Sequence, residues 1–158
     1  MVKPRKKRNV LYPPRILYFK PQGIPVKNLS SVTLTVDEYE AIRLADHKKL
    51  KQEDAAKKMN ISRPTFTRLI NSARKKTAEA IIDGKAIKIE GGSFIFLKNR
   101  IRCLRCGNVW DTKIAPASNL TCPNCYGNKL EDVGNKLSRG IPGGGRRRRG
   151  RNCEVQIV

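Results

Sequence analysis

The sequence has few of the residues that catalysis usually needs. Among its 158 residues there is one histidine, His47. We find no paired nucleophile and base, and no glycine-rich loop that would bind a phosphate group. A lone histidine in the link between two expected helices is typical of a surface position. The sequence therefore does not predict an enzyme.

Long apolar runs are also missing. No stretch approaches the ~18 apolar residues of a membrane-spanning helix. Pro13, Pro14 and Arg15 interrupt the start of the chain before a signal-like apolar core could form. We therefore expect a cytoplasmic protein with no membrane partner. In that compartment its five cysteines indicate metal binding rather than disulfides.

Acidic residues are scarce, because 13 Asp and Glu stand against 34 Lys and Arg, which gives a formal net charge of +21. The excess is uneven. Residues 1–28 carry eight basic residues and no acid, residues 35–83 carry only +3, and residues 138–158 carry +5. So large a charge favours a polyanionic partner. Basic arms beside a folded part are typical of proteins that bind nucleic-acid phosphates.

Residues 52–74 have the pattern of a helix-turn-helix, which is two helices joined by a tight turn. Asn60 suits the left-handed conformation that commonly ends a helix, and Ser62 is expected to cap the next helix. In that second helix an inward stripe, mostly apolar, repeats with the helical period. The residues of the stripe are Phe66, Leu69, Ile70, Ala73 and Thr77.

The outer face of the second helix carries short hydroxyls, an amide and cations, but no acid. A helix that enters the major groove of DNA needs a face of this kind, although an ordinary solvated helix can look similar. The sequence predicts that this helix and the start of the preceding one contact DNA. The predicted DNA-binding residues are Lys51, Gln52, Arg63, Thr65, Thr67, Arg68, Asn71, Ser72 and Lys75.

Two further elements are expected around this pair of helices. Thr35 and Glu38 match a capping box that would start a third helix over residues 36–45. That helix can cover apolar surface that the pair cannot bury alone. Residues 86–97 contain two β-rich runs on either side of a Gly-Gly pair, and this pattern predicts a β-hairpin.

Four of the five cysteines occur as two Cys-x2-Cys pairs. Each pair can present two thiolates to one ion, and two pairs close a tetrahedral site. So short a segment has too little core to fold alone, and metal binding would supply the missing folding energy. Zinc is expected, while iron stays an alternative because the same thiolates can hold it. The predicted ligands are Cys103, Cys106, Cys122 and Cys125, and Cys153 receives no role.

These patterns together predict a mainly α fold. A three-helix helix-turn-helix domain is followed by a β-hairpin and a small zinc-ribbon β module, with basic flexible termini. The predicted parts are a proline-rich basic arm over residues 1–28, the helical domain with its hairpin over 29–97, the four-cysteine ribbon over 98–137 and a Gly/Arg-rich tail over 138–158.

The chain also resembles a prokaryotic family, the domain-of-unknown-function family numbered 134, over residues 3–94. The resemblance implies a DNA-binding protein whose helix-turn-helix is similar to region four of sigma factors. One departure is Lys51, because a serine-like cap would be expected there. The matching stretches are the arm Pro4–Arg8, Phe19–Pro21, Leu34–Asp46, Gln52–Arg68, Ala73–Arg74, Gly84–Ala86 and Ile89–Gly92.

We therefore expect a transcriptional regulator that binds duplex DNA. An RNA- or ribosome-associated protein is an alternative, since small basic proteins with zinc ribbons also bind folded RNA. A metal- or redox-responsive regulator, in which the ribbon gates DNA binding, is a third hypothesis. The sequence leaves open the operator, any effector and whether the chain forms a homo-oligomer.

Overall fold

The computed structural model describes residues 6–113 and 119–138. These residues form two compact units, which divide the chain after Val10, after Arg15 and after Phe94. No helix in the described ranges is long and apolar enough to cross a membrane. The predictions for Cys153 and for the arginine-rich tail fall outside the described residues, as does the start of the basic arm.

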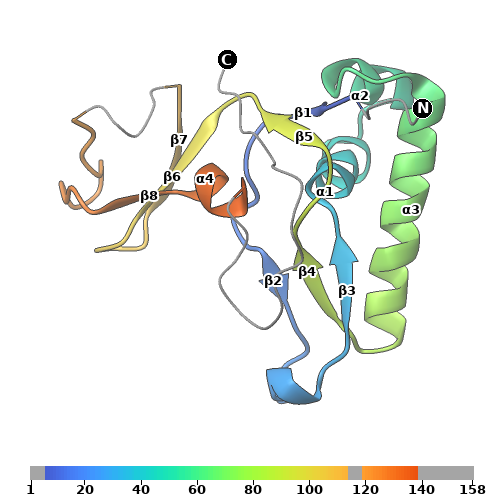
Figure 1. Cartoon of the computed structure of the whole chain (residues 1–158), viewed down its shortest axis with the longest axis horizontal. Coiled ribbons are helices and arrows are strands. Elements are labelled where there is room, and N and C mark those ends of the chain that lie inside the picture. Colours follow the sequence, from blue (N-terminus) through green and yellow to red (C-terminus); the bar gives the residue numbers. More distant parts are fainter. Residues whose placement is uncertain (1–5, 114–118, 139–158) are drawn as a thin grey trace, which may run out of the picture. The chain divides into compact units, whose positions relative to one another are not determined.

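The first unit contains a small three-stranded sheet (Figure 1). β3 (Ser31–Leu34) and β4 (Ala86–Ile89) run parallel, and β2 (Tyr18–Phe19) pairs antiparallel with the other edge of β4. A separate two-stranded sheet pairs β1 (Arg8–Val10) with β5 (Phe94–Phe96). Parallel neighbours require a crossover connection, and the helices between β3 and β4 form it.

The crossover consists of three helices and a short irregular turn. α1 (Val36–Ile42) continues into a π-helical turn, η2 (Arg43–His47), and is followed by α2 (Gln52–Lys58) and α3 (Arg63–Ile82). α3 has 20 residues and packs against α1, α2 and β3. A 3-10 turn, η1 (Val26–Asn28), precedes β3.

The apolar faces of these helices meet in one core. Phe66 and Ile70 of α3 are fully buried, as the predicted inward stripe requires. Met59 ends α2 and is fully buried with them. The partly buried Ile61 packs against the cluster, in the position expected of a hydrophobic staple. The core residues are Ala41, Leu44, Ala55, Ala56, Met59, Phe66, Leu69 and Ile70.

The helix starts follow the local sequence signals. The Thr35 hydroxyl accepts from the Glu38 amide while the Glu38 carboxylate accepts from the Thr35 amide, which completes the predicted capping box. The Ser62 hydroxyl caps α3 by accepting from the Thr65 amide. Asn60 ends the preceding segment at a φ of 54°. These three predictions are confirmed because each depends only on contacts within a few residues.

The prediction of a mainly α fold with a three-helix helix-turn-helix domain is wrong. The described residues combine helices with three small sheets, and the helices cross over between two parallel strands. The predicted hairpin over residues 86–97 is wrong as well, because β4 and β5 belong to different sheets. Ala86–Ile89 pairs with Ser31–Leu34 instead. This partner lies far away in the sequence, so local periodicity could not reveal it.

The second unit contains an antiparallel sheet in which β6 (Asn99–Cys103) lies between β7 (Val109–Thr112) and β8 (Leu130–Asp132). A short helix, α4 (Val133–Ser138), follows β8 and packs against β6. The sequence did not predict α4, since its six residues are too few to show a helical period.

A buried arginine holds residues 11–15 against the rest of the second unit. Arg100 is only 8% exposed. Its guanidinium donates two hydrogen bonds to Asp111, at 2.5 and 2.9 Å, and one of 2.7 Å to the carbonyl of Pro13. It also lies 4.9 Å from the ring centre of Tyr12. A buried cation is tolerated when it is paired in this way.

Candidate functional site

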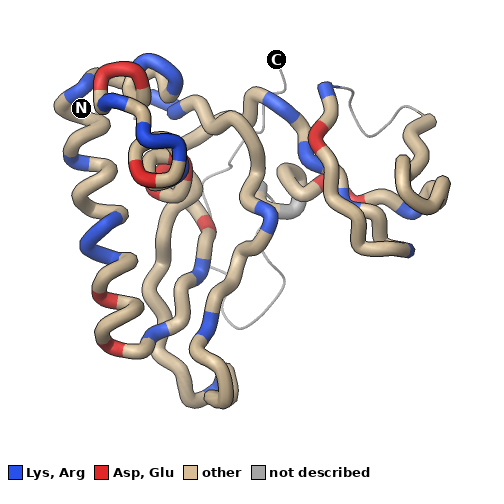
Figure 2. Tube along the Cα trace, turned by 180° about the vertical axis from the view of Figure 1, so that it is seen from behind, with Lys and Arg blue, Asp and Glu red and all other residues tan. Residues whose placement is uncertain are grey.

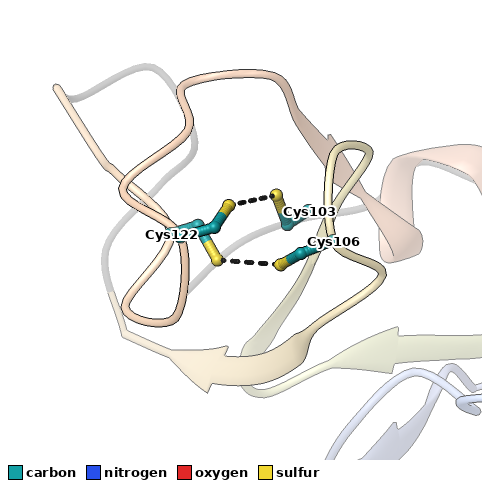
Figure 3. Close-up of side chains that lie close together, drawn as sticks. Cys103, Cys106 and Cys122 are labelled. Atoms are coloured by element: carbon teal, nitrogen blue, oxygen red, sulfur yellow. Dashed lines mark hydrogen bonds between the residues drawn. The ribbon is translucent and has the colours of Figure 1, made fainter.

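The first candidate site is the cysteine cluster of the second unit (Figure 3). The sulfurs of Cys103 and Cys125 lie 3.6 Å apart, as do those of Cys106 and Cys122, and all four lie within 4.8 Å of one another. Tetrahedral zinc with bonds of about 2.3 Å separates its sulfur ligands by about 3.8 Å. The structure thus brings the four predicted ligands together at a spacing that could hold one metal ion.

Two similar turns position these cysteines. The amide of Gly107 donates to the carbonyl of Cys103 at 3.0 Å, and the amide of Tyr126 donates to the carbonyl of Cys122 at 2.8 Å. Each turn therefore closes on its first cysteine and presents both thiols on one side. The amide of Asn124 also lies 3.4 Å from the Cys122 sulfur, as expected of a turn that stabilises thiolates.

The surroundings shift the pKa values of Cys106 and Cys125 in opposite directions. Hydrogen bonds from the Asn108 backbone amide and from Asn124 lower the pKa of Cys106 to about 6. The Gly127 amide favours the Cys125 thiolate, but burial and the neighbouring sulfurs outweigh it and raise the pKa of Cys125 to about 12. Deprotonation of one thiol is therefore opposed by the negative charge of the neighbouring thiolates. A cation between the sulfurs would relieve that repulsion.

The second candidate site is the exposed face of α3. Arg63, Arg68, Asn71 and Lys75 are all exposed on it. Arg63 pairs with Glu53 at 3.2 Å, and both side chains are about two-thirds exposed. Within the part of the chain that the structure describes, Arg68, Asn71 and Lys75 make no hydrogen bond or ion pair. Their polar groups are therefore available to a ligand.

Other predicted DNA-binding residues make contacts inside the protein. The Thr67 hydroxyl donates to Gln52 at 2.7 Å, which joins α3 to the first turn of α2. The Thr65 hydroxyl lies 2.8 Å from that of Ser62. Lys51 is exposed at the start of α2 and makes no capping bond. The first two contacts can hold the exposed face of α3 in place.

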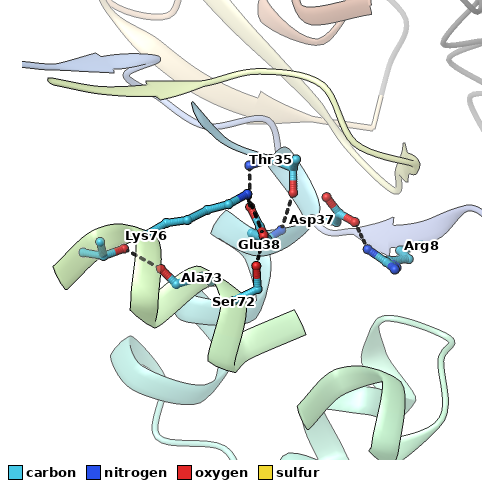
Figure 4. A network of polar contacts seen from close by, with 8 residues as sticks. Arg8, Thr35, Asp37, Glu38, Ser72, Ala73 and Lys76 are labelled. Carbon is cyan, nitrogen blue, oxygen red and sulfur yellow. Dashed lines mark hydrogen bonds and ion pairs between the residues drawn. The ribbon is translucent and has the colours of Figure 1, made fainter. Parts of the chain in front are cut away.

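A polar network ties the remaining predicted residue, Ser72, to α1 (Figure 4). The Ser72 hydroxyl donates to Glu38 at 2.7 Å, and the Lys76 ammonium donates to both Glu38 oxygens at 2.9 and 2.7 Å. Burial would raise the pKa of Glu38, but the bonds from Lys76, Ser72 and Thr35 outweigh it and lower that pKa. The sequence did not indicate this network, because Glu38 lies far from α3 along the chain.

A hollow of about 890 Å³ lies beside the same face. Lys6, Arg8, Lys57 and Arg68 line it together with the acidic Glu38 and the hydroxyls of Ser62, Thr65 and Ser72. Arg8 pairs with Asp37, and Lys6 donates to Asn60. The sequence named neither Lys6 nor Lys57 as a site residue. Lys57 lies at the end of α2, and the turn before α3 brings it to the same hollow as Arg68.

Figure 2 shows how charge is distributed along this unit. On α3 the one acid, Glu79, lies in its last turns, while five basic residues lie between Arg63 and Lys76. The half of α3 that adjoins the hollow, Arg63–Ser72, carries two of these basic residues, Arg63 and Arg68, and no acid. An anion that approached this half would meet cations from the arm, from α2 and from α3.

Comparison with known proteins identifies the family. The family described as "Protein of unknown function DUF134" matches residues 1–97, and the chain belongs to it. The resemblance found from the sequence is thereby confirmed, whereas the similarity to region four of sigma factors stays a prediction. No solved structure matches the chain.

Relatives of similar length share much of the sequence. A UPF0251 protein of Desulforudis audaxviator is 43% identical over 148 residues, which is 94% of this chain and 97% of the relative. A UPF0251 protein of Chloroherpeton thalassium is 46% identical over 151 residues, 96% of this chain and 99% of the relative. A third, from Halothermothrix orenii, is 44% identical over 84% of this chain and its own full length.

Proposed function

We propose that the chain is a DNA-binding protein, a transcriptional regulator that contacts duplex DNA through the exposed face of α3. The observation that carries this proposal is a row of exposed polar side chains on α3, Arg68, Asn71 and Lys75, which make no hydrogen bond or ion pair within residues 6–113 and 119–138. Guanidinium and amide groups are those that bind base edges in the major groove. The proposal includes no catalytic role.

The surroundings of α3 support this role. Its inner face is held by a close-packed core, and the bond between Gln52 and Thr67 restrains it against α2. A binding helix fixed in this way loses little conformational freedom when it binds. The Arg63–Glu53 pair is a surface ion pair worth at most about 1 kcal/mol, so Arg63 can exchange Glu53 for a phosphate.

The hollow supplies further positive charge beside α3. Lys57 lines it and makes no ion pair among the residues described. Phosphate contacts of this kind position a protein on DNA without selecting a sequence. In this proposal the face of α3 supplies the sequence preference, and the cations beside it supply general affinity for DNA.

The second part of the proposal is that the cysteine cluster binds a structural zinc ion through Cys103, Cys106, Cys122 and Cys125. Four thiolates without an open coordination position are typical of structural zinc. The bound ion would hold the two turns together and keep the thiols deprotonated. Iron is the alternative, and elemental analysis of freshly purified protein distinguishes the two metals. Absence of both metals would refute the site.

A matched pair of double variants tests DNA binding. We expect R68A/N71A to weaken binding to a duplex selected from random sequences by roughly 2–6 kcal/mol, since each lost base contact costs about 1–3 kcal/mol. The control is K27A/N28A, which also removes one cation and one amide from exposed positions, on η1. Binding is measured by fluorescence anisotropy on the selected duplex and on a scrambled one.

The outcomes separate the hypotheses. R68A/N71A should lose the preference for the selected duplex, while K27A/N28A should retain it. Equal behaviour of the two variants on both duplexes would refute the role of α3. A wild-type chain that prefers structured RNA to duplex DNA, in competition at fixed salt, would favour the RNA-binding alternative instead.

A further inference from the structure

The two cysteine turns place different residues at equivalent positions. Gly107 follows the second cysteine of the first turn, at a φ of +74°. Tyr126 follows the second cysteine of the other turn, at a φ of +56°. Both residues donate the amide bond that closes their turn. The turn therefore requires a left-handed residue there, and only the first turn has the residue type that adopts this conformation freely.

A tyrosine at this position is not explained by the fold of its own unit. A positive φ is rare for a bulky side chain, because its Cβ approaches the following carbonyl. Packing of the ring could offset that strain, but Tyr126 is 80% exposed. Glycine would form the same turn without strain. The ring is thus exposed at a conformational cost, as is often seen at functional sites.

The two turns also carry exposed apolar and basic side chains. Leu104, in the other turn, is 60% exposed, and its amide donates to the carbonyl of Lys129 at 2.9 Å. The Arg105 side chain lies against Gly127, next to Tyr126 in the chain. Within residues 103–110 and 119–130, Arg105 and Lys129 are the charged residues, and there is no acid.

We propose that Tyr126 stacks on an unpaired nucleobase of single-stranded nucleic acid, while Arg105 and Lys129 contact the adjoining phosphates. Every base presents an aromatic face, and exposed aromatic rings between cations are the usual means of binding single strands. The basic surroundings favour this occupant over an apolar protein surface. This site differs from the duplex-binding face of α3 and lies in the other unit.

The test uses the full-length, metal-loaded chain and single-stranded DNA and RNA probes of about 12 nucleotides that contain 2-aminopurine, whose fluorescence changes when it stacks. We expect binding to change the fluorescence. Y126F should preserve affinity and fluorescence change, whereas Y126A and Y126G should lose the change and bind roughly 10-fold more weakly. F19A, which removes another exposed aromatic side chain, should behave as the wild type.

Y126G separates binding from folding, because glycine relieves the strained φ. Its thermal midpoint should equal or exceed that of the wild type. Retained affinity and fluorescence change in Y126G would overturn the proposal. A lower thermal midpoint of Y126G than of the wild type would also overturn it, because the ring would then stabilise the fold. So would a wild-type chain that leaves the 2-aminopurine fluorescence unchanged, which is the result expected if Tyr126 binds a protein instead.

Affinity for the selected duplex provides an independent control. The Tyr126 variants should bind that duplex as the wild type does, since α3 is unaltered in them. Normal duplex binding with no effect of Y126G on the single-stranded probes would refute this site alone. Loss of duplex binding in R68A/N71A, with an unchanged 2-aminopurine signal, would support a Tyr126 site that is independent of α3.

Discussion

Substitution of Glu38 by glutamine tests how α3 is fixed to the rest of its unit. Glu38 is 5% exposed and accepts hydrogen bonds from the Thr35 amide, the Ser72 hydroxyl and the Lys76 ammonium. The neutral amide of glutamine keeps one acceptor oxygen, but its NH2 group replaces the other oxygen and faces donors of the protein. Ser72 can rotate to another acceptor, and Lys76 is 32% exposed and can regain water.

The magnitude follows from these contacts. A hydrogen bond to a charged group contributes about 1.5–3 kcal/mol, and removal of one partner of a fully buried ion pair costs about 3–5 kcal/mol. Because Lys76 is only partly buried, we expect E38Q to lower the free energy of unfolding by about 2 kcal/mol at neutral pH. The control E79Q removes a half-exposed carboxylate from α3 and should change it by less than about 0.5 kcal/mol.

The loss of unfolding free energy in E38Q, relative to the wild type, should shrink as the pH falls. The folded-state pKa of Glu38 is lowered from 4.5, so the unfolded chain binds its proton first as the pH falls. The stabilisation by Glu38 is fully present above about pH 4.5 and is lost as the pH falls through the folded-state pKa. Urea unfolding of wild type, E38Q and E79Q across this range measures it. Equal stability of E38Q and wild type at neutral pH would refute the reasoning. So would a deficit that stays constant as the pH falls.

Two further predictions concern the metal site and a glycine. C106S should abolish the binding of one metal ion per chain and unfold the ribbon while the first unit stays folded, whereas C153S should keep the metal. Elemental analysis measures the metal and circular dichroism measures the folding, and retained metal in C106S would contradict the site. G92A should destabilise the chain by about 2 kcal/mol or more, because Gly92 has a φ of +103° and a Cβ there would clash with Asp37. G91A, at a φ of +70° with open space around it, should cost about 1 kcal/mol. Equal unfolding midpoints of the two alanine variants would contradict the clash.

The features predicted correctly from the sequence depend on contacts between near neighbours. The caps at Thr35 and Ser62, the left-handed Asn60 and the inward stripe of α3 each involve residues at most a few positions apart. The paired cysteines belong with them, since two residues between the thiols are enough to define each turn. The helical period of α3 also predicted that Arg68 and Asn71 lie on its exposed face, and both are exposed.

The overall fold could not be obtained in this way. Residues 86–89 are equally suited to a hairpin and to a parallel strand, and the choice depends on their partner at 31–34. A mainly α fold followed from three well-marked helices, because strands of three or four residues carry little periodic signal. The same reason explains why α4 was not predicted.

The sequence alone therefore determined which residues start helices, which face of α3 is apolar and which thiols can share an ion, because the interactions responsible are local. The tertiary structure decided what lies beside each of them. It placed Glu38 under Ser72 and Lys76, brought Lys57 to Arg68 at one hollow, and buried Arg100 against Pro13 and Asp111. These contacts join segments far apart in the chain, and the packing that selects them is a property of the whole fold rather than of any one stretch.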